Sequence, residues 1–145
     1  MDTKTRNSRI IIVIILIIGF IFFTQKDNFY PQSESISSVS NPVPENFVIP
    51  DLNNQQTSGQ TAFGQYCQSC HGQYALGTNK GPTFMHAIYL PGHHGDGAFF
   101  QAATYGAQAH HWSFGDMPPV EGVSGDEVAA IIAYVRALQR ANGME

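Results

Sequence analysis

This chain of 145 residues has few cysteines, few basic residues and few alternating β-branched segments. Both cysteines lie in one short stretch, Cys67 and Cys70, so no cysteine is left near the N-terminus to carry a lipid. The lack of alternating β-branched residues argues against the βαβ unit on which a thioredoxin-like dithiol normally lies. It also leaves no strand to predict, and we expect an all-α fold.

Positive charge is scarcest in the second part of the chain. From residue 51 onward the net charge is −4, because three basic residues oppose seven acidic ones. The basic residues are Lys80, Arg136 and Arg140, and the acidic ones are Asp51, Asp96, Asp116, Glu121, Asp126, Glu127 and Glu145. This balance argues against nucleic-acid binding. A lysine ring for docking on acidic partners is also absent, so we expect docking on an apolar, neutral or basic surface.

The most informative stretch is Cys67-Gln68-Ser69-Cys70-His71. Two cysteines at this spacing lie about one helical turn apart, so both sulfurs can reach one edge of a porphyrin. The histidine that follows then lies under the ring, where its imidazole can bind iron. This spacing is typical of covalent attachment of a c-type haem.

Three other readings of the same five residues stay open. The cysteines would form a structural disulfide in an oxidising compartment, although the ring closed by a two-residue gap is small and strained. They would form a redox-active dithiol on a suitable fold. They would bind zinc if His86, His93 or His94 supplied a fourth ligand.

An uninterrupted apolar run covers Ile10–Phe23 and follows three basic residues. Its 14 residues are fewer than the roughly 20 that an upright transmembrane helix needs, and the length alone resembles an export signal. No Ala-x-Ala cleavage pattern follows it. We therefore predict that residues 10–26 are a transmembrane anchor or a signal segment, and we favour an uncleaved anchor.

The charges that flank the apolar run predict its orientation. Basic residues precede the run and a near-neutral pair follows it, so residues 1–9 are expected to be a basic cytoplasmic tail. Residues 27–50 are rich in Ser, Asn and Pro and predict a flexible linker. Residues 51–145 then form one domain outside the cell membrane, in a periplasm or on the outer surface.

The last helix of that domain is the clearest structural prediction. Ser124 is a good N-cap, and Glu127 completes a capping box. Apolar residues recur behind it at helical spacing, namely Val128, Ile131, Ile132, Val135 and Leu138. Arg136 and Arg140 suit the negative end of the helix dipole, and Gly143 can end the helix.

Two further helices are expected. The first runs from about Ser58 into the cysteine motif, and Gly59 on its buried face permits close contact with the last helix near Tyr134. Another begins near Asp96 and ends by Gly106. The residues expected on the buried sides of these helices are Phe63, Tyr66, Phe99, Phe100 and Ala103.

These features resemble those of class I c-type cytochromes of the short bacterial monohaem kind. The matching residues are Gly59 and Phe63, then Cys67, Cys70 and His71, then Gly81-Pro82, then Met117-Pro118-Pro119, and Tyr134 in the last helix. The resemblance covers roughly the final 90 residues and implies three to four helices around one covalent haem c. It implies that His71 and Met117 bind the iron, and that the Pro82 carbonyl accepts a hydrogen bond from His71. Since so small a domain has a marginal core, we expect it to be largely unfolded without haem.

The chemistry of methionine supports Met117 independently. A thioether is soft and neutral, so it favours ferrous iron, and the two prolines that follow stiffen the chain that presents it. Met117 comes 46 residues after His71, far enough for the chain to reach the opposite face of the ring. Met85, the rival, is expected to pack against the haem edge. Other candidate haem contacts are Tyr89, Tyr105 and Trp112.

Five further histidines compete for the iron: His86, His93, His94, His110 and His111. A second imidazole would lower the reduction potential. The two doublets, His93-His94 and His110-His111, also suit copper or zinc. Their role stays open.

We expect an electron carrier and not an enzyme, because two protein ligands leave the iron no open position. Its donors and acceptors would be membrane redox complexes, as in a respiratory chain, with the N-terminal segment anchored in the bilayer. Two alternatives stay open. One is a haem subunit of a larger oxidase or dehydrogenase, and the other is a peroxidase or reductase with a labile distal ligand.

Overall fold

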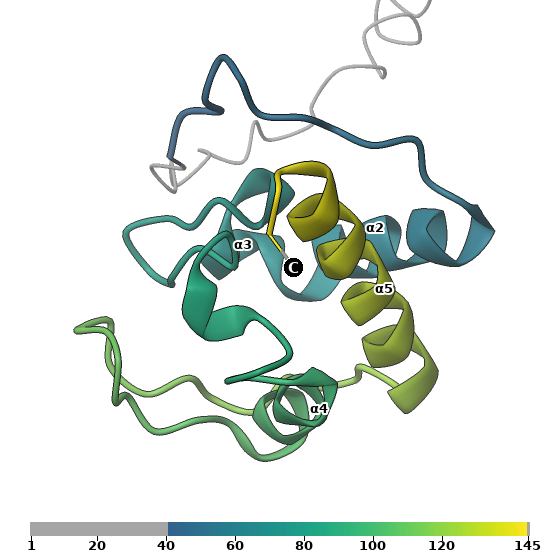
Figure 1. Cartoon of the computed structure of the whole chain (residues 1–145). Helices are drawn as coiled ribbons and strands as arrows, with labels where there is room; N and C mark the ends of the chain where they lie inside the picture. Colours follow the sequence, from purple (N-terminus) through teal and green to yellow (C-terminus); the bar gives the residue numbers. More distant parts are fainter. Residues whose placement is uncertain (1–40, 145) are drawn as a thin grey trace, which may run out of the picture. The chain divides into compact units, whose positions relative to one another are not determined.

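The computed structural model describes residues 41–144 (Figure 1). The predicted tail over 1–9, the anchor or signal over 10–26 and the linker up to residue 40 lie outside the described residues. Within 41–144, no helix is long and apolar enough to cross a membrane.

The described part of the chain is helical, as predicted. Its α-helices are α2 (Asn54–Tyr66), α3 (Gln68–His71), α4 (Asp96–Tyr105) and α5 (Gly125–Ala141), and its 3-10 helices are η1 (Gln73–Ala75) and η2 (Ala87–Tyr89). Among these residues no β-sheet forms, and an isolated bridge pairs Ala107 with Met117.

Helix α5 confirms the predicted start and stop signals. The Ser124 side chain accepts a hydrogen bond from the Glu127 backbone N–H, and the Glu127 carboxylate accepts one from the Ser124 backbone N–H. Asn142 is the C-cap, and Gly143 follows with φ of 72°, the left-handed conformation that glycine favours. The predicted apolar stripe is buried along its whole length.

Helices α2 and α5 cross and make the most extensive contact between helices (Figure 1). At the crossing, a Cβ added to Gly59 would lie 1.9 Å from the Ala130 carbonyl oxygen, so only glycine fits. Close by, the rings of Phe63 and Tyr134 lie 5.6 Å apart, and both side chains are buried. Gly59 therefore contacts the backbone of Ala130, whereas Phe63 contacts Tyr134.

Two details of the predicted helices are wrong. Helix α2 begins at Asn54, four residues before the expected start, because Asn53 and Gln56 form a capping box. Because these polar residues are also common in linkers, the sequence alone did not indicate that a helix begins here. In α4 the predicted bounds are confirmed, and Phe99 packs against the core, but Phe100 is 37% exposed.

Residues 41–50, the last part of the predicted linker, lie on the domain. The Asn41 side chain donates to the Leu76 carbonyl at 2.8 Å, and its backbone N–H donates to the Gly77 carbonyl at 3.2 Å. At the other end, the Asn142 side chain exchanges two hydrogen bonds with the backbone of Val48, at 2.8 and 2.9 Å. The domain boundary at residue 51 stays a prediction, and the contacts show that the ten residues before it are attached.

Candidate haem site

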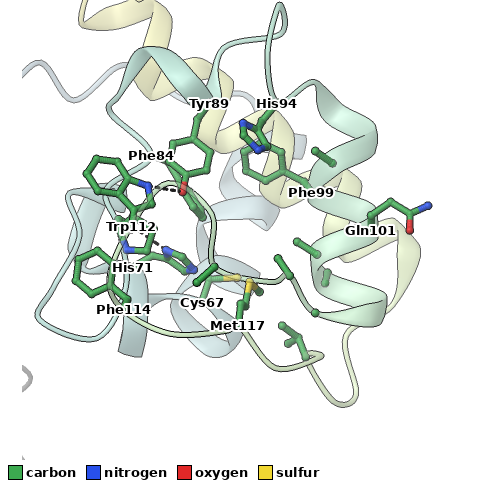
Figure 2. A pocket seen from close by; sticks show the side chains of 18 of the residues that line it. Cys67, His71, Phe84, Tyr89, His94, Phe99, Gln101, Trp112, Phe114 and Met117 are labelled. Carbon is green, nitrogen blue, oxygen red and sulfur yellow. Dashed lines mark hydrogen bonds between the residues drawn. The ribbon is translucent and has the colours of Figure 1, made fainter.

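An apolar cavity of about 410 Å³ opens between α3, α4, α5 and the loop after α4 (Figure 2). Four of the five predicted site residues border the cavity: Cys67, His71, Pro82 and Met117. They come from three separate segments of the chain. The fold therefore brings the predicted residues to one place.

His71 is fixed at the end of α3 with its ring at the cavity. Its Nδ1 lies 2.9 Å from the Pro82 carbonyl oxygen, which accepts a hydrogen bond from the ring N–H, as predicted. This tautomer leaves Nε2 without a proton and therefore able to bind a metal. Burial lowers the pKa of His71, and the bond to Pro82 opposes that effect. The ring is thus a neutral imidazole held in one orientation.

The turn after His71 is built by two glycines. Gly72 has a φ of 74°, and a Cβ there would lie 2.4 Å from the Gly77 carbonyl oxygen. Gly77 donates its N–H to the His71 carbonyl at 2.7 Å. This tight turn lets the chain double back, so that Pro82 reaches the ring of His71.

Cys67 and Cys70 form no disulfide with each other. Cys67 borders the cavity, while Cys70 is exposed. Burial, and to a smaller extent the charge of Cys70, raises the pKa of Cys67 to about 11. A raised pKa disfavours the thiolate on which a redox-active dithiol depends. Zinc binding is not supported either, because neither sulfur joins a group of three metal ligands within residues 41–144.

Met117 is held at the cavity by its backbone. Its N–H and carbonyl pair with the carbonyl and N–H of Ala107, both at 2.9 Å. Just before the bridge, Gly106 ends α4 with a φ of 77°, and a Cβ there would lie 2.4 Å from the Met117 carbonyl oxygen. The methionine is therefore fixed against the end of α4, which the sequence spacing did not reveal.

Aromatic side chains form another part of the cavity wall. Tyr89 and Trp112 border the cavity as expected, and the indole N–H of Trp112 donates to the Tyr89 hydroxyl at 3.2 Å (Figure 2). Tyr105 is 74% exposed and lies outside the cavity lining, so its contact with the haem or its propionates stays a prediction. Met85 packs against the hydrophobic core and lies outside the cavity lining, so among the methionines of residues 41–144 it is Met117 that borders the cavity together with His71.

The residues at this cavity fit a covalently attached haem. The apolar walls suit a porphyrin, Cys67 and Cys70 are placed to form its thioethers, and His71 offers an unprotonated nitrogen. When bound, such a haem supplies one-electron exchange between ferric and ferrous iron. The protein's part is to exclude water from the cavity and to keep the ligands in place.

A small helical domain with this Cys-x-x-Cys-His cavity defines the class of c-type haem proteins. The sequence profile of the family described as Cytochrome c matches residues 56–139, more than half of the chain, and the chain therefore belongs to that family. It is accordingly a haem-binding electron carrier with covalently attached haem c. No curated protein and no solved structure matched the chain.

Arg136 has a role that the sequence did not indicate. It was expected to complement the helix dipole, but its side chain is buried, only 8% exposed, and makes specific contacts. Its guanidinium donates to the carbonyls of Tyr89 and His94 and forms an ion pair with Asp96 at 2.9 Å. The guanidinium also lies 5.2 Å from the centre of the Phe99 ring. It therefore ties the loop before α4 to α5.

Proposed function

We propose that this cytochrome c is a one-electron carrier whose iron is bound by His71 and Met117. The observation that carries the proposal is that both side chains border one cavity and that each is fixed by a separate backbone contact. With a protein ligand on each side of the haem plane, the coordination of the iron would change little between the ferric and ferrous states. A rigid site of this kind suits electron transfer and leaves no position for a substrate.

We further propose that the carrier exchanges electrons with membrane redox complexes outside the cytoplasmic membrane. The apolar run within residues 10–26 supports an anchor, and thioether attachment of haem fits a domain that lies outside. The acidic balance of the domain favours partners with an apolar, neutral or basic docking surface. Retention of the haem protein in the membrane fraction, and its release when residues 1–26 are removed, would support the anchor.

Replacement of Met117 tests the assignment of the distal ligand. In the full-length haem protein, Met117→Ala is expected to abolish the weak long-wavelength charge-transfer band of the ferric form. The ferrous form should then bind carbon monoxide, while haem stays covalently attached. Met85→Ala is the matched control, because this sulfur packs in the core outside the cavity lining, and it should keep the band.

Two results would contradict the proposal. If Met117→Ala keeps the band and excludes carbon monoxide, Met117 is not a ligand. If the unmodified protein already binds carbon monoxide readily, the distal position is open, and the enzymatic alternative gains support.

A further inference from the structure

Four histidines that are not among the proposed iron ligands gather at one place. His93 and His94 lie in the loop before α4, and His110 and His111 lie in the loop after it. The His111 ring lies 5.1 Å from that of His93, 5.2 Å from that of His94 and 4.2 Å from that of His110, between ring centres. Helix α4 thus brings two doublets 18 residues apart in sequence into one cluster.

Three of these histidines have the spacing of metal ligands. One ring nitrogen from each of His93, His94 and His111 lies within 4.8 Å of the others. The Nε2 atoms of His93 and His111 are 3.1 Å apart. Nitrogens bound at about 2.0–2.1 Å to one ion lie roughly 2.9 Å apart at neighbouring corners of a square plane and roughly 3.3 Å apart in a tetrahedron. The distance between the two Nε2 atoms, which share a hydrogen bond, lies between the two values, so a bound ion could take the place of the shared proton. Small rotations would bring the third nitrogen to the same ion.

His94 is oriented as a metal ligand usually is. Its Nδ1 lies 2.6 Å from the Ile88 carbonyl oxygen, so this nitrogen carries the proton and Nε2 keeps its lone pair. The His94 carbonyl accepts a hydrogen bond from Arg136 at 3.1 Å, which fixes the backbone as well. The ring is therefore held by two contacts before any ion is bound.

The cluster also borders the haem cavity. His94, His110 and His111 belong to the cavity lining, whereas His93 lies outside it and is exposed. Neutral imidazole is the commonest protein ligand of metal ions, so rings that crowd together in this way suit a shared cation.

We propose that His93, His94 and His111 form a second metal site, which binds one copper(II) ion at the rim of the haem cavity. Imidazole nitrogen suits both copper and zinc, and copper(II) is bound more tightly at a given nitrogen site. Three protein ligands leave one position for water or a small molecule. This metal binding would be a property additional to electron transfer, and it does not depend on whether Met117 binds the iron.

Metal titration of the full-length haem protein tests this site. After treatment with a chelator, the protein is titrated with copper(II) and, separately, with zinc(II), and the stoichiometry and Kd are measured by calorimetry. We expect one copper(II) ion per chain, with a Kd lower than that for zinc(II). The electron paramagnetic resonance spectrum of the bound copper should show splitting from several imidazole nitrogens.

The informative variant is His93→Gln, because His93 is exposed and lies outside the haem cavity lining. It should keep the haem spectrum and raise the Kd for copper(II) at least tenfold. His86→Gln is the matched control, since His86 is exposed and meets Trp112 edge to face outside the three-histidine group, and it should keep the Kd of the unmodified protein. The proposal is overturned if the unmodified protein binds no copper stoichiometrically, or if His93→Gln leaves Kd and nitrogen splitting unchanged.

Discussion

Ala107 and Met117 exchange two backbone hydrogen bonds of 2.9 Å, and so form a bridge that closes the loop after α4. The loop is poor in regular structure, and it carries the sulfur proposed to bind the iron. The bridge fixes the backbone of Met117 itself, and Pro118 and Pro119 restrict the backbone that follows it. A distal ligand is thus presented from a loop without the mobility that loops usually have.

Gly106→Ala is expected to disturb the distal ligand without touching the haem. Gly106 has a φ of 77°, and the added Cβ would lie 2.4 Å from the Met117 carbonyl oxygen, so the bridge to Ala107 must shift. We expect the ferric charge-transfer band to weaken and the ferrous protein to bind carbon monoxide, with haem still attached. Absorption spectra of both oxidation states measure the effect.

Gly97→Ala is the control for that substitution. Gly97 lies in the first turn of α4, and a Cβ there meets no atom within 4 Å. This variant should keep the band at full strength. If the two glycine variants have identical spectra, the close approach of Gly106 to Met117 does not position the ligand.

Two glycines of α2 should respond to alanine in opposite directions. Gly59→Ala places a Cβ 1.9 Å from the Ala130 carbonyl oxygen, so α2 and α5 must separate, at a cost of about 3 kcal/mol in the free energy of unfolding. Gly64→Ala meets only a side-chain atom at 3.8 Å and should stabilise the helix by about 0.5–1 kcal/mol. Denaturant unfolding of the haem protein measures both, and changes of the same sign would refute the packing argument.

Local signals explain which helices were predictable. Helix α5 has a capping box and a long apolar stripe, and both can be read directly from adjacent residues. Helix α2 starts earlier than predicted because Asn53 and Gln56 cap it, yet the same residues are common in linkers. The attachment of residues 41–50 depends on Asn142, which lies 94 residues from Val48 in the sequence. Such contacts depend on the assembled fold and have no local pattern.

The residues of the candidate sites also fall into two groups, those that the sequence predicts and those that only the assembled fold brings together. Its cysteines, His71 and Met117 follow from motif and chemistry, and the Pro82 contact followed from the family resemblance. The convergence of His93, His94 and His111 could not be derived from their spacing, because it requires the loop after α4 to fold back toward the start of that helix. Arg136 was assigned to the helix end by position, but its face of α5 turns it inward toward the loop that carries His94.

Arg136 and Asp96 should differ in their contribution to stability, although they form one ion pair. Arg136→Met removes the donor to the His94 carbonyl and leaves the Tyr89 carbonyl with the longer bond from Gln139, so it should lower the free energy of unfolding by about 2–4 kcal/mol. Asp96→Asn should cost under about 1 kcal/mol, since its side chain is 61% exposed. Denaturant titrations compare the two, and equal losses would mean that the ion pair, not the carbonyl contacts, stabilises the loop.

The capping box of α5 should make stability depend on pH in acid. The Ser124 backbone N–H and then its hydroxyl donate to the Glu127 carboxylate, which lowers the pKa of Glu127 below its usual 4.5. This stabilisation is fully present above pH 4.5 and is lost as the pH falls through the lowered pKa. Glu127→Gln keeps a hydrogen-bond acceptor but no titrating group. The Tm of the unmodified protein should therefore exceed that of the variant at neutral pH, and the difference should shrink on acidification. A difference that stays constant with pH would show that the carboxylate charge does not stabilise α5.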